Sequence, residues 1–326
     1  MGFIPSAAAA ASGAGGPVVK VDATIYQIYV TSTGDITGPP GWTASRWQQG
    51  TYFINPPSDL LPDLRLPEVC IWGAYIATSG GGREVAVTMS SSALTAWTYR
   101  SLDGGLVDSN FYIWVAVGPA CRKIVWTGNT GEIFPGFTAP DGWTVNRTNV
   151  GQYTVNMPGV GNIDQREGGA AFAGIGYGQT GEGVNVTALP SVVNPEQINI
   201  ETRRQLDGAL IDKDAILNVL VGEVEGCRAL GGNFQGDSPP GWTVTGFSGG
   251  LSRVDPQLGV FPILPVQDGL GIMVNCLTGQ APEFAGFYLR FFGQAFIEVH
   301  TYRQSDGADN VDKIYNLALV QGNPPE

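Results

Sequence analysis

Acidic side chains recur in pairs at three places, and carboxylate pairs can bind calcium or hydrolyse glycosidic bonds. A calcium site needs six or more oxygen ligands, commonly from a DxDxDG-type loop, and this chain has no such loop. A glycosidase pair would not be copied into every repeat of a protein. We therefore predict that the first aspartate of each pair forms an Asp-Gly turn and the second caps the next strand. The pairs are Asp103 and Asp108, Asp207 and Asp212, and Asp306 and Asp312.

An arginine precedes each aspartate pair, and we expect it to form a modest surface ion pair with those carboxylates. These arginines are Arg100, Arg204 and Arg303. The single histidine, His300, lies in a predicted strand with no GxSxG phrase to supply a nucleophile, which favours a structural role. No nucleophile–base pair is recognisable, so we predict that the protein is not an enzyme.

The four cysteines show no CxxC motif or Cys/His cluster, so neither a metal site nor another cofactor site is predicted. Cys121 and Cys227 both precede an arginine and are assigned to matching starts of two repeats, whereas Cys70 and Cys276 have no counterparts. We expect buried free thiols rather than a disulfide framework.

Three tryptophans follow rigid Pro/Gly or Asp-Gly corners at repeated positions: Trp42, Trp143 and Trp242. They could stack on carbohydrate or anchor a core, and their fixed position in each repeat favours the core. Aromatic residues in less regular surroundings are freer to contact a ligand, although they converge on no recognisable site; these are Trp47, Trp72 and Tyr177.

The repeated phrases that hold these residues divide the chain into three units. Gly-Trp-Thr occurs at residues 41–43, 142–144 and 241–243, and a closing pattern of Thr, Arg, Asp-Gly, Asp and an apolar run follows each time. Spacings of about 100 residues match a small domain. We predict an Ala/Gly-rich arm over 1–17 and β-domains over 18–118, 119–223 and 224–326.

Alternating apolar residues in each unit predict strands rather than helices. Leu94, Ala96 and Thr98 share one face of a strand, and Ile198, Ile200 and Thr202 repeat the pattern. We therefore predict an all-β protein of three tandem β-sandwich, jelly-roll-like domains. The Trp-led hairpin is similar in units one and two, and we expect it to be longer or displaced in unit three, where Gly246 replaces an arginine.

Composition narrows the class of partner. The formal net charge is −12, which argues against nucleic acid, and no segment approaches the ~20 apolar residues that span a bilayer. Charged residues make up only 14% of the chain. Either neighbouring subunits cover much of the surface, or uncharged Ser, Thr and Asn side chains form it.

The Gly-Trp-Thr-Val-Asn-Arg phrase, the Gly151-Gln152-Tyr153 segment and the closing Asp-Gly/Asp pattern resemble the repeated β-domains of tailed-bacteriophage virion proteins. That family includes head fibres, capsid decoration proteins and tail fibres. The resemblance spans about residues 20–322 and implies a non-enzymatic virion component that stabilises the shell or projects from it.

The expected partners are capsid or tail proteins and other copies of the chain, in a homo-oligomer such as a trimer, with a host-surface glycan as a further partner. Three units allow either a stacked homotrimer or one chain with pseudo-threefold packing. The alternative function is a cell-surface or secreted carbohydrate-binding array.

Overall fold

The structure is a computed structural model. It describes residues 20–58, 60–61, 63–77, 83–100, 103–160, 171–177, 186–194, 196–204, 209–221, 225–230, 243–247, 251–255, 270–276, 285–292, 296–303 and 314–323. All helical or strand structure in this part of the chain is β-strand, so the all-β prediction is confirmed. Within these ranges no helix could cross a membrane. The predicted arm of residues 1–17 lies outside the described residues.

Unit one forms two antiparallel sheets. The outer sheet has the order β3-β4-β7-β6, and the inner sheet has the order β1-β8-β5, with the short β2 paired to β1. Period-two alternation fits this arrangement, because each strand turns one face to the core and the other away from it. The strands are β1 (Lys20–Val30), β2 (Ile36–Thr37), β3 (Thr43–Gln48), β4 (Thr51–Asn55), β5 (Val69–Ile76), β6 (Arg83–Met89), β7 (Leu94–Arg100) and β8 (Phe111–Val117).

Unit two repeats this order. Its outer sheet is β10-β11-β14-β13 and its inner sheet is β9-β15-β12. The strands are β9 (Cys121–Trp126), β10 (Thr144–Asn149), β11 (Gln152–Asn156), β12 (Ala171–Tyr177), β13 (Val186–Asn194), β14 (Gln197–Arg204) and β15 (Ala215–Val221).

Unit three repeats the order again, with an outer sheet β17-β18-β21-β20 and with β22 paired between β16 and β19. The strands are β16 (Glu225–Leu230), β17 (Thr243–Phe247), β18 (Leu251–Asp255), β19 (Leu270–Cys276), β20 (Ala285–Phe292), β21 (Phe296–Arg303) and β22 (Ile314–Asn323). The strand order therefore recurs three times, as the repeated phrases predict. The domain limits at residues 118 and 223 stay a prediction.

The hairpin of unit three is not longer or displaced, so that prediction is wrong. Thr243 lies opposite Asp255, and Thr43 and Thr144 lie opposite Asn55 and Asn156 in the other units. The three hairpins thus join residues at the same separation in sequence. The arginine is lost from unit three without a change in hairpin length.

The apolar faces meet between the two sheets. In unit one, Ile54 and Leu94 of the outer sheet and Ile28 and Ile113 of the inner sheet belong to one buried cluster. A second cluster in unit two joins residues of its outer and inner sheets in the same way. The predicted core positions of β7 and β14 are all buried: Leu94, Ala96, Thr98, Ile198, Ile200 and Thr202.

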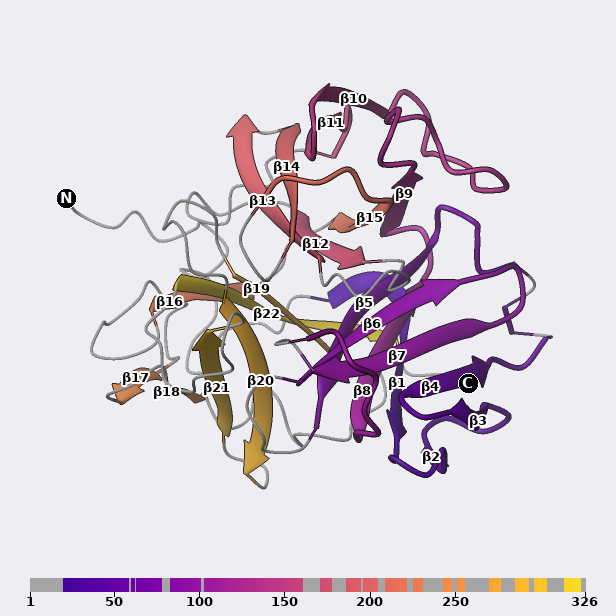
Figure 1. Ribbon diagram of the computed structural model, residues 1–326, viewed down its shortest axis with the longest axis vertical. Coiled ribbons are helices and arrows are strands. Elements are labelled where there is room, and N and C mark those ends of the chain that lie inside the picture. Colours follow the sequence, from indigo (N-terminus) through magenta and orange to yellow (C-terminus); the bar gives the residue numbers. More distant parts are fainter. Residues whose placement is uncertain are drawn as a thin grey trace.

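The three units surround a common centre. The outer sheets lie at three corners of the molecule, while β5, β12 and β19 lie between them and contact one another (Figure 1). Val125 of β9 and Ile216 of β15 belong to the buried cluster of unit one, although both are unit-two residues. Units one and two therefore share apolar packing and are not beads on a string.

The first and last described strands close this arrangement into a ring. β1 pairs parallel to β22, with Lys20 opposite Gln321 and Thr24 opposite Asn323. This pairing joins the inner sheets of units one and three into a single seven-stranded sheet. The approach is close at Gly322, where an added Cβ would overlap the carbonyl oxygen of Ala23.

Candidate functional site

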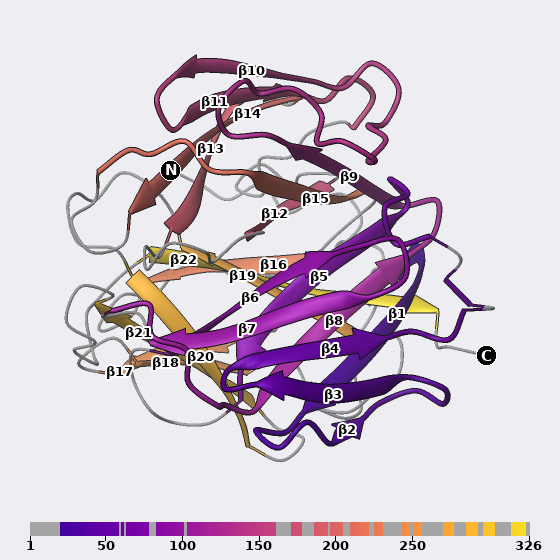
Figure 2. The same ribbon diagram turned by 45° about the vertical axis from the view of Figure 1, so that its right-hand side comes forward.

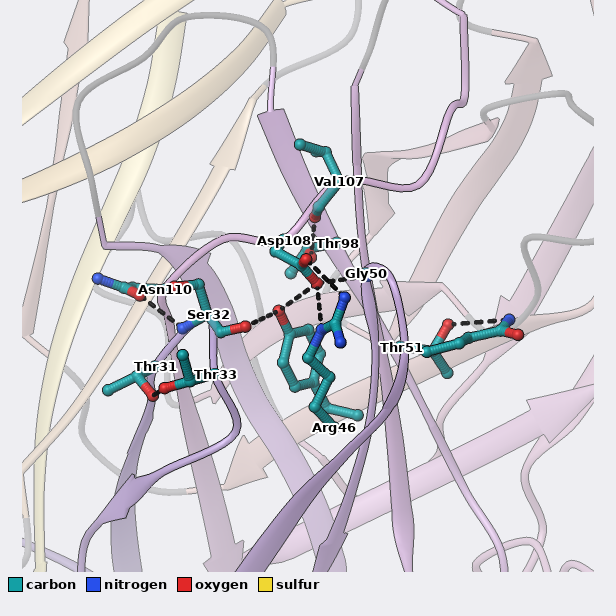
Figure 3. Close-up of polar contacts among 12 residues, drawn as sticks. Thr31, Ser32, Thr33, Arg46, Gly50, Thr51, Thr98, Val107, Asp108 and Asn110 are labelled. Carbon is teal, nitrogen blue, oxygen red and sulfur yellow. Dashed lines mark hydrogen bonds and ion pairs between the residues drawn. The ribbon is translucent and has the colours of Figure 1, made fainter.

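Asp108, the second member of the first aspartate pair, lies at the centre of a polar cluster in unit one (Figure 3). Arg46 Nε and Nη2 donate to its two carboxylate oxygens, each at 2.8 Å. The backbone N–H of Gly50, in the turn between β3 and β4, donates to Oδ1 at 2.8 Å. Tyr52 Oη lies 3.2 Å from both Asp108 Oδ1 and the carbonyl oxygen of Ser32. We call these four residues, Arg46, Gly50, Tyr52 and Asp108, the unit-one clamp.

Glycine is required at the turn of this clamp. Gly50 has a φ of +64°, and an added Cβ would lie 2.5 Å from the carbonyl oxygen of Thr98. That carbonyl belongs to the neighbouring strand β7, whose Thr98 N–H donates to the oxygen of Gly50 at 2.8 Å. A side chain at this position would separate the hairpin from β7.

Unit two contains the same clamp. Arg147 Nε and Nη2 donate to Asp212 at 3.0 and 2.8 Å, and the N–H of Gly151 donates to Asp212 Oδ1 at 2.8 Å. Tyr153 Oη lies 3.2 Å from the same oxygen and donates to the carbonyl of Gly128 at 2.7 Å. We call Arg147, Gly151, Tyr153 and Asp212 the unit-two clamp. Each clamp ties the β-hairpin to the segment before the last strand of its unit.

The pKa shifts in both clamps indicate that the carboxylates of Asp108 and Asp212 are charged. Hydrogen bonds from Arg46 hold the pKa of Asp108 below its ordinary value, and those from Arg147 do the same for Asp212. Burial raises the pKa of Tyr52, and it raises the pKa of Tyr153 to about 12. Both phenols therefore stay protonated at neutral pH and can donate to their carboxylates.

These contacts make the aspartates structural. The lowered pKa values of both carboxyls keep them charged and do not suit a general acid, which needs a raised pKa. Within the described ranges, no group of three or more His, Cys, Asp or Glu residues could hold a metal ion. The sequence predicts that the second aspartate of each pair caps the next strand. That interpretation is wrong for Asp108 and Asp212, which bind the hairpin turn instead.

The first aspartate of unit one behaves as predicted. Asp103 accepts the N–H of Gly105 at 2.9 Å, and its Oδ2 lies 2.7 Å from Nη2 of Arg100, so the predicted turn and ion pair are both confirmed there. Asp207, Asp306 and Asp312 lie outside the described residues, as do the side chains of Arg204 and Arg303.

The arginines of the clamps were missed because they come from the hairpin, 62 and 65 residues before their aspartates. One signal could have found them, since Trp-x3-Arg-x3-Gly-x-Tyr occurs in units one and two with the same spacing. In unit three, the pairing register puts Gly246 opposite Ser252, where unit one pairs Arg46 with Tyr52. Both clamp side chains of the hairpin are replaced there together.

The tryptophans divide into two kinds. Trp42 and Trp143 are buried, which confirms core anchoring in units one and two, whereas Trp242 lies outside the described residues. Trp47 on β3 is 65% exposed, the largest exposed fraction among the large apolar side chains of the described residues. The side chains of Trp72 and Tyr177 lie outside the described residues.

A buried lysine links units one and two. Lys123 of β9 is fully buried, and its Nζ donates to the carbonyl of Leu64 at 2.6 Å and lies 2.9 Å from Met89 Sδ, both in unit one. The Phe137 ring centroid is 5.5 Å from the same nitrogen. Burial lowers the pKa of Lys123 to about 8.

Two cysteines lie in the same contact between β5 and β9. Cys70 and Cys121 are free and buried, as predicted, and Cys70 Sγ donates to the carbonyl of Arg122 at 3.2 Å. The side chains of Cys227 and Cys276 lie outside the described residues.

The predicted match between Cys121 and Cys227 is wrong. Cys227 lies opposite Leu317, and the corresponding residue of unit two, Leu217, lies opposite Ile124. Cys227 therefore corresponds to Ile124, three residues beyond Cys121.

His300 lies on β21, the strand predicted for it, and its backbone pairs with Leu251 and Tyr288. Its side chain lies outside the described residues.

Comparison with protein-family models, curated proteins and solved structures gives no match to this chain.

Proposed function

We propose that this chain is a non-enzymatic structural protein of a virus particle, attached as a capsid decoration, head fibre or tail fibre component. The observation that carries the proposal is the closed arrangement of three similar units, in which β5, β12 and β19 contact one another and β22 pairs with β1. Such a body presents three related faces about one centre. It thereby suits a place where neighbouring subunits are themselves related by threefold symmetry.

The hydrogen bonds of the charged aspartates support a structural rather than a catalytic role. Asp108 and Asp212, the best-placed carboxylates, are both fully engaged by clamp donors. Each clamp fixes a hairpin to its own unit, so the units are built for rigidity. The sequence resemblance to repeated virion β-domains points in the same direction.

The same arrangement supports pseudo-threefold packing of one chain over a stacked homotrimer. Three units already contact one another within the chain, and unit two contributes Val125 and Ile216 to the core of unit one. We therefore expect light scattering to give the single-chain mass of 34.4 kDa for the purified protein. A mass three times larger would favour the homotrimer.

The test of the virion role is association with particles. An antibody against the purified chain is used to probe density-gradient fractions of virus particles from cultures that produce the protein, with immunogold labelling of the peak. The proposal predicts that the chain co-sediments with particles and labels the head or tail. If it remains at the top of the gradient, or on cell envelopes, the proposal is wrong.

A further inference from the structure

The outer face of the unit-one outer sheet differs in chemistry from its counterpart in unit two. Along β4, Tyr52 and Ile54 turn into the core, which leaves Phe53 on the opposite face; along β7, Leu94 and Ala96 do the same and leave Trp97. Trp47 of β3 lies beside Phe53, with ring centroids 5.6 Å apart and planes tilted by 39°. Figure 2 shows this sheet at the front of the molecule. We call Trp47, Phe53 and Trp97 the aromatic face.

Unit two shows that the fold does not need these aromatic residues. The pairing register places Thr148, Thr154 and Glu201 at the positions of Trp47, Phe53 and Trp97. The unit-two hairpin has the same irregularity at Thr148 and the same clamp. The neighbouring polar side chains there bond to one another instead, with Thr154 Oγ1 2.7 Å from Asn199 Oδ1.

The exposure of Trp47 is therefore not explained by packing. At 65% exposure, its indole leaves most of its apolar surface in water, although a threonine serves at the same position of unit two. Removing such a surface from water is favourable, and exposed aromatic residues are enriched where proteins bind ligands. The aromatic face has the character of a binding surface.

The residues around the aromatic face indicate the chemical class of its ligand. The partly or fully exposed residues that share this face on β3, β4 and β7 are uncharged: Thr43, Ser45, Asn55 and Thr95. Gln48 Nε2 lies 3.5 Å from Thr51 Oγ1 and adds an exposed amide beside Trp47. On these three strands the face thus combines flat rings with hydroxyl and amide groups and carries no charge, while the edge strand β6 places Glu84 opposite Tyr99 on the same face.

We propose that the aromatic face binds a neutral oligosaccharide made of pyranose rings. The C–H groups on one side of a pyranose are electropositive and apolar, and they fit the negative face of an indole ring. The hydroxyls at the ring edge exchange hydrogen bonds with the side chains of Gln48 and Ser45. The net charge of −12 disfavours anionic sugars such as uronic or sialic acids. This inference goes beyond the virion role and does not depend on it.

The test uses cellohexaose, maltohexaose, mannohexaose, xylohexaose and chitohexaose as probes, titrated into the full chain by calorimetry and by tryptophan fluorescence. Binding of at least one probe is expected. Trp47→Thr is the informative variant, because it introduces the residue that unit two has at the same irregularity of a hairpin with the same clamp. Loss of the stacked ring should weaken binding at least about tenfold, within the range of ring stacking seen elsewhere.

Two further variants complete the design. Trp47→Phe should retain most of the affinity, and Thr148→Ala, at the matching position of unit two, should leave it unchanged. Absence of binding to all five probes would overturn the inference, and so would equal affinity of the Trp47→Thr variant. Particle association of this variant, measured as above, should be normal, so failure of sugar binding can be told apart from failure of the virion role.

Discussion

Removing the Asp108 carboxylate tests whether the clamps hold the units together. In the Asp108→Ala variant, Tyr52 can still donate to the carbonyl of Ser32, but the buried N–H of Gly50 loses its acceptor. An unsatisfied buried donor costs about 1–3 kcal/mol, and the partly exposed ion pair with Arg46 adds little to this. We expect a loss of about 2 kcal/mol in the free energy of unfolding and a fall in Tm of about 3 °C.

The assay is denaturant and thermal unfolding followed by circular dichroism, with two comparisons. Asp212→Ala removes the same four hydrogen bonds from unit two and should show a similar loss. Asp103→Ala removes an exposed carboxylate from the same segment as Asp108 and should change stability much less. If Asp108→Ala is no more harmful than Asp103→Ala, then the clamp is not a stabilising element and the reasoning fails.

The same clamps predict how stability depends on pH. Because the pKa values of Asp108 and Asp212 are lower in the folded chain than in the unfolded chain, their contribution is fully present above the unfolded value of about 3.9. It is lost as the pH falls from about 4 through the folded values. The double variant Asp108→Asn/Asp212→Asn should lose less stability than the wild type over this acid range, and an equally steep loss would contradict the assignment.

Three other changes follow from the structure. Gly151→Ala should lower the free energy of unfolding by at least about 1 kcal/mol more than Gly159→Ala does. The Cβ at position 151 would lie 2.6 Å from the carbonyl oxygen of Thr202, whereas that at position 159 meets nothing within 4 Å. Equal losses in urea unfolding would refute this. The pKa of Lys123 is about 8 in the folded chain and about 10.4 in the unfolded chain, so the free energy of unfolding should rise between these pH values in the wild type and not in Lys123→Met. If its slope against pH is the same in both proteins, the buried ammonium does not contribute to it. Ile216→Ala should lower the free energy of unfolding by about 2–5 kcal/mol and reduce amide protection against hydrogen exchange in units one and two together. Loss of protection in unit two alone would contradict the shared core.

The sequence was sufficient for the features that depend on local patterns. Alternation along β7 and β14 correctly predicted core positions such as Leu94 and Ile198, and the Pro/Gly corners correctly predicted that Trp42 and Trp143 anchor the cores. Sheet strands have a period of two, so one buried face is legible from the residues alone. Because each pattern occurs three times, the threefold repeat could be predicted from the sequence.

Contacts between distant segments were harder to predict. The partner of Asp108 is Arg46, and the sequence offered the nearer Arg100 as an equally charged choice. The partners of Lys123 lie in a loop and a strand of another unit, and their carbonyl and thioether groups leave no charge pattern. The match between Cys121 and Cys227 failed because a Cys-Arg dipeptide was aligned without the strand register, which only pairing with β15 and β22 defines.

The parallel contact of β1 with β22 also has a mechanical consequence. A pulling force applied between residues 20 and 323 would act along both strands in opposite directions, because Lys20 pairs with Gln321 and Thr24 with Asn323. The hydrogen bonds between them would then be loaded in shear and would have to break together, not one after another as in unzipping. The strands are held on their other sides by β8 and by β19, so they could not rotate freely to escape the load. The fold therefore places a strand pair that would be loaded in shear where its first and last described strands meet.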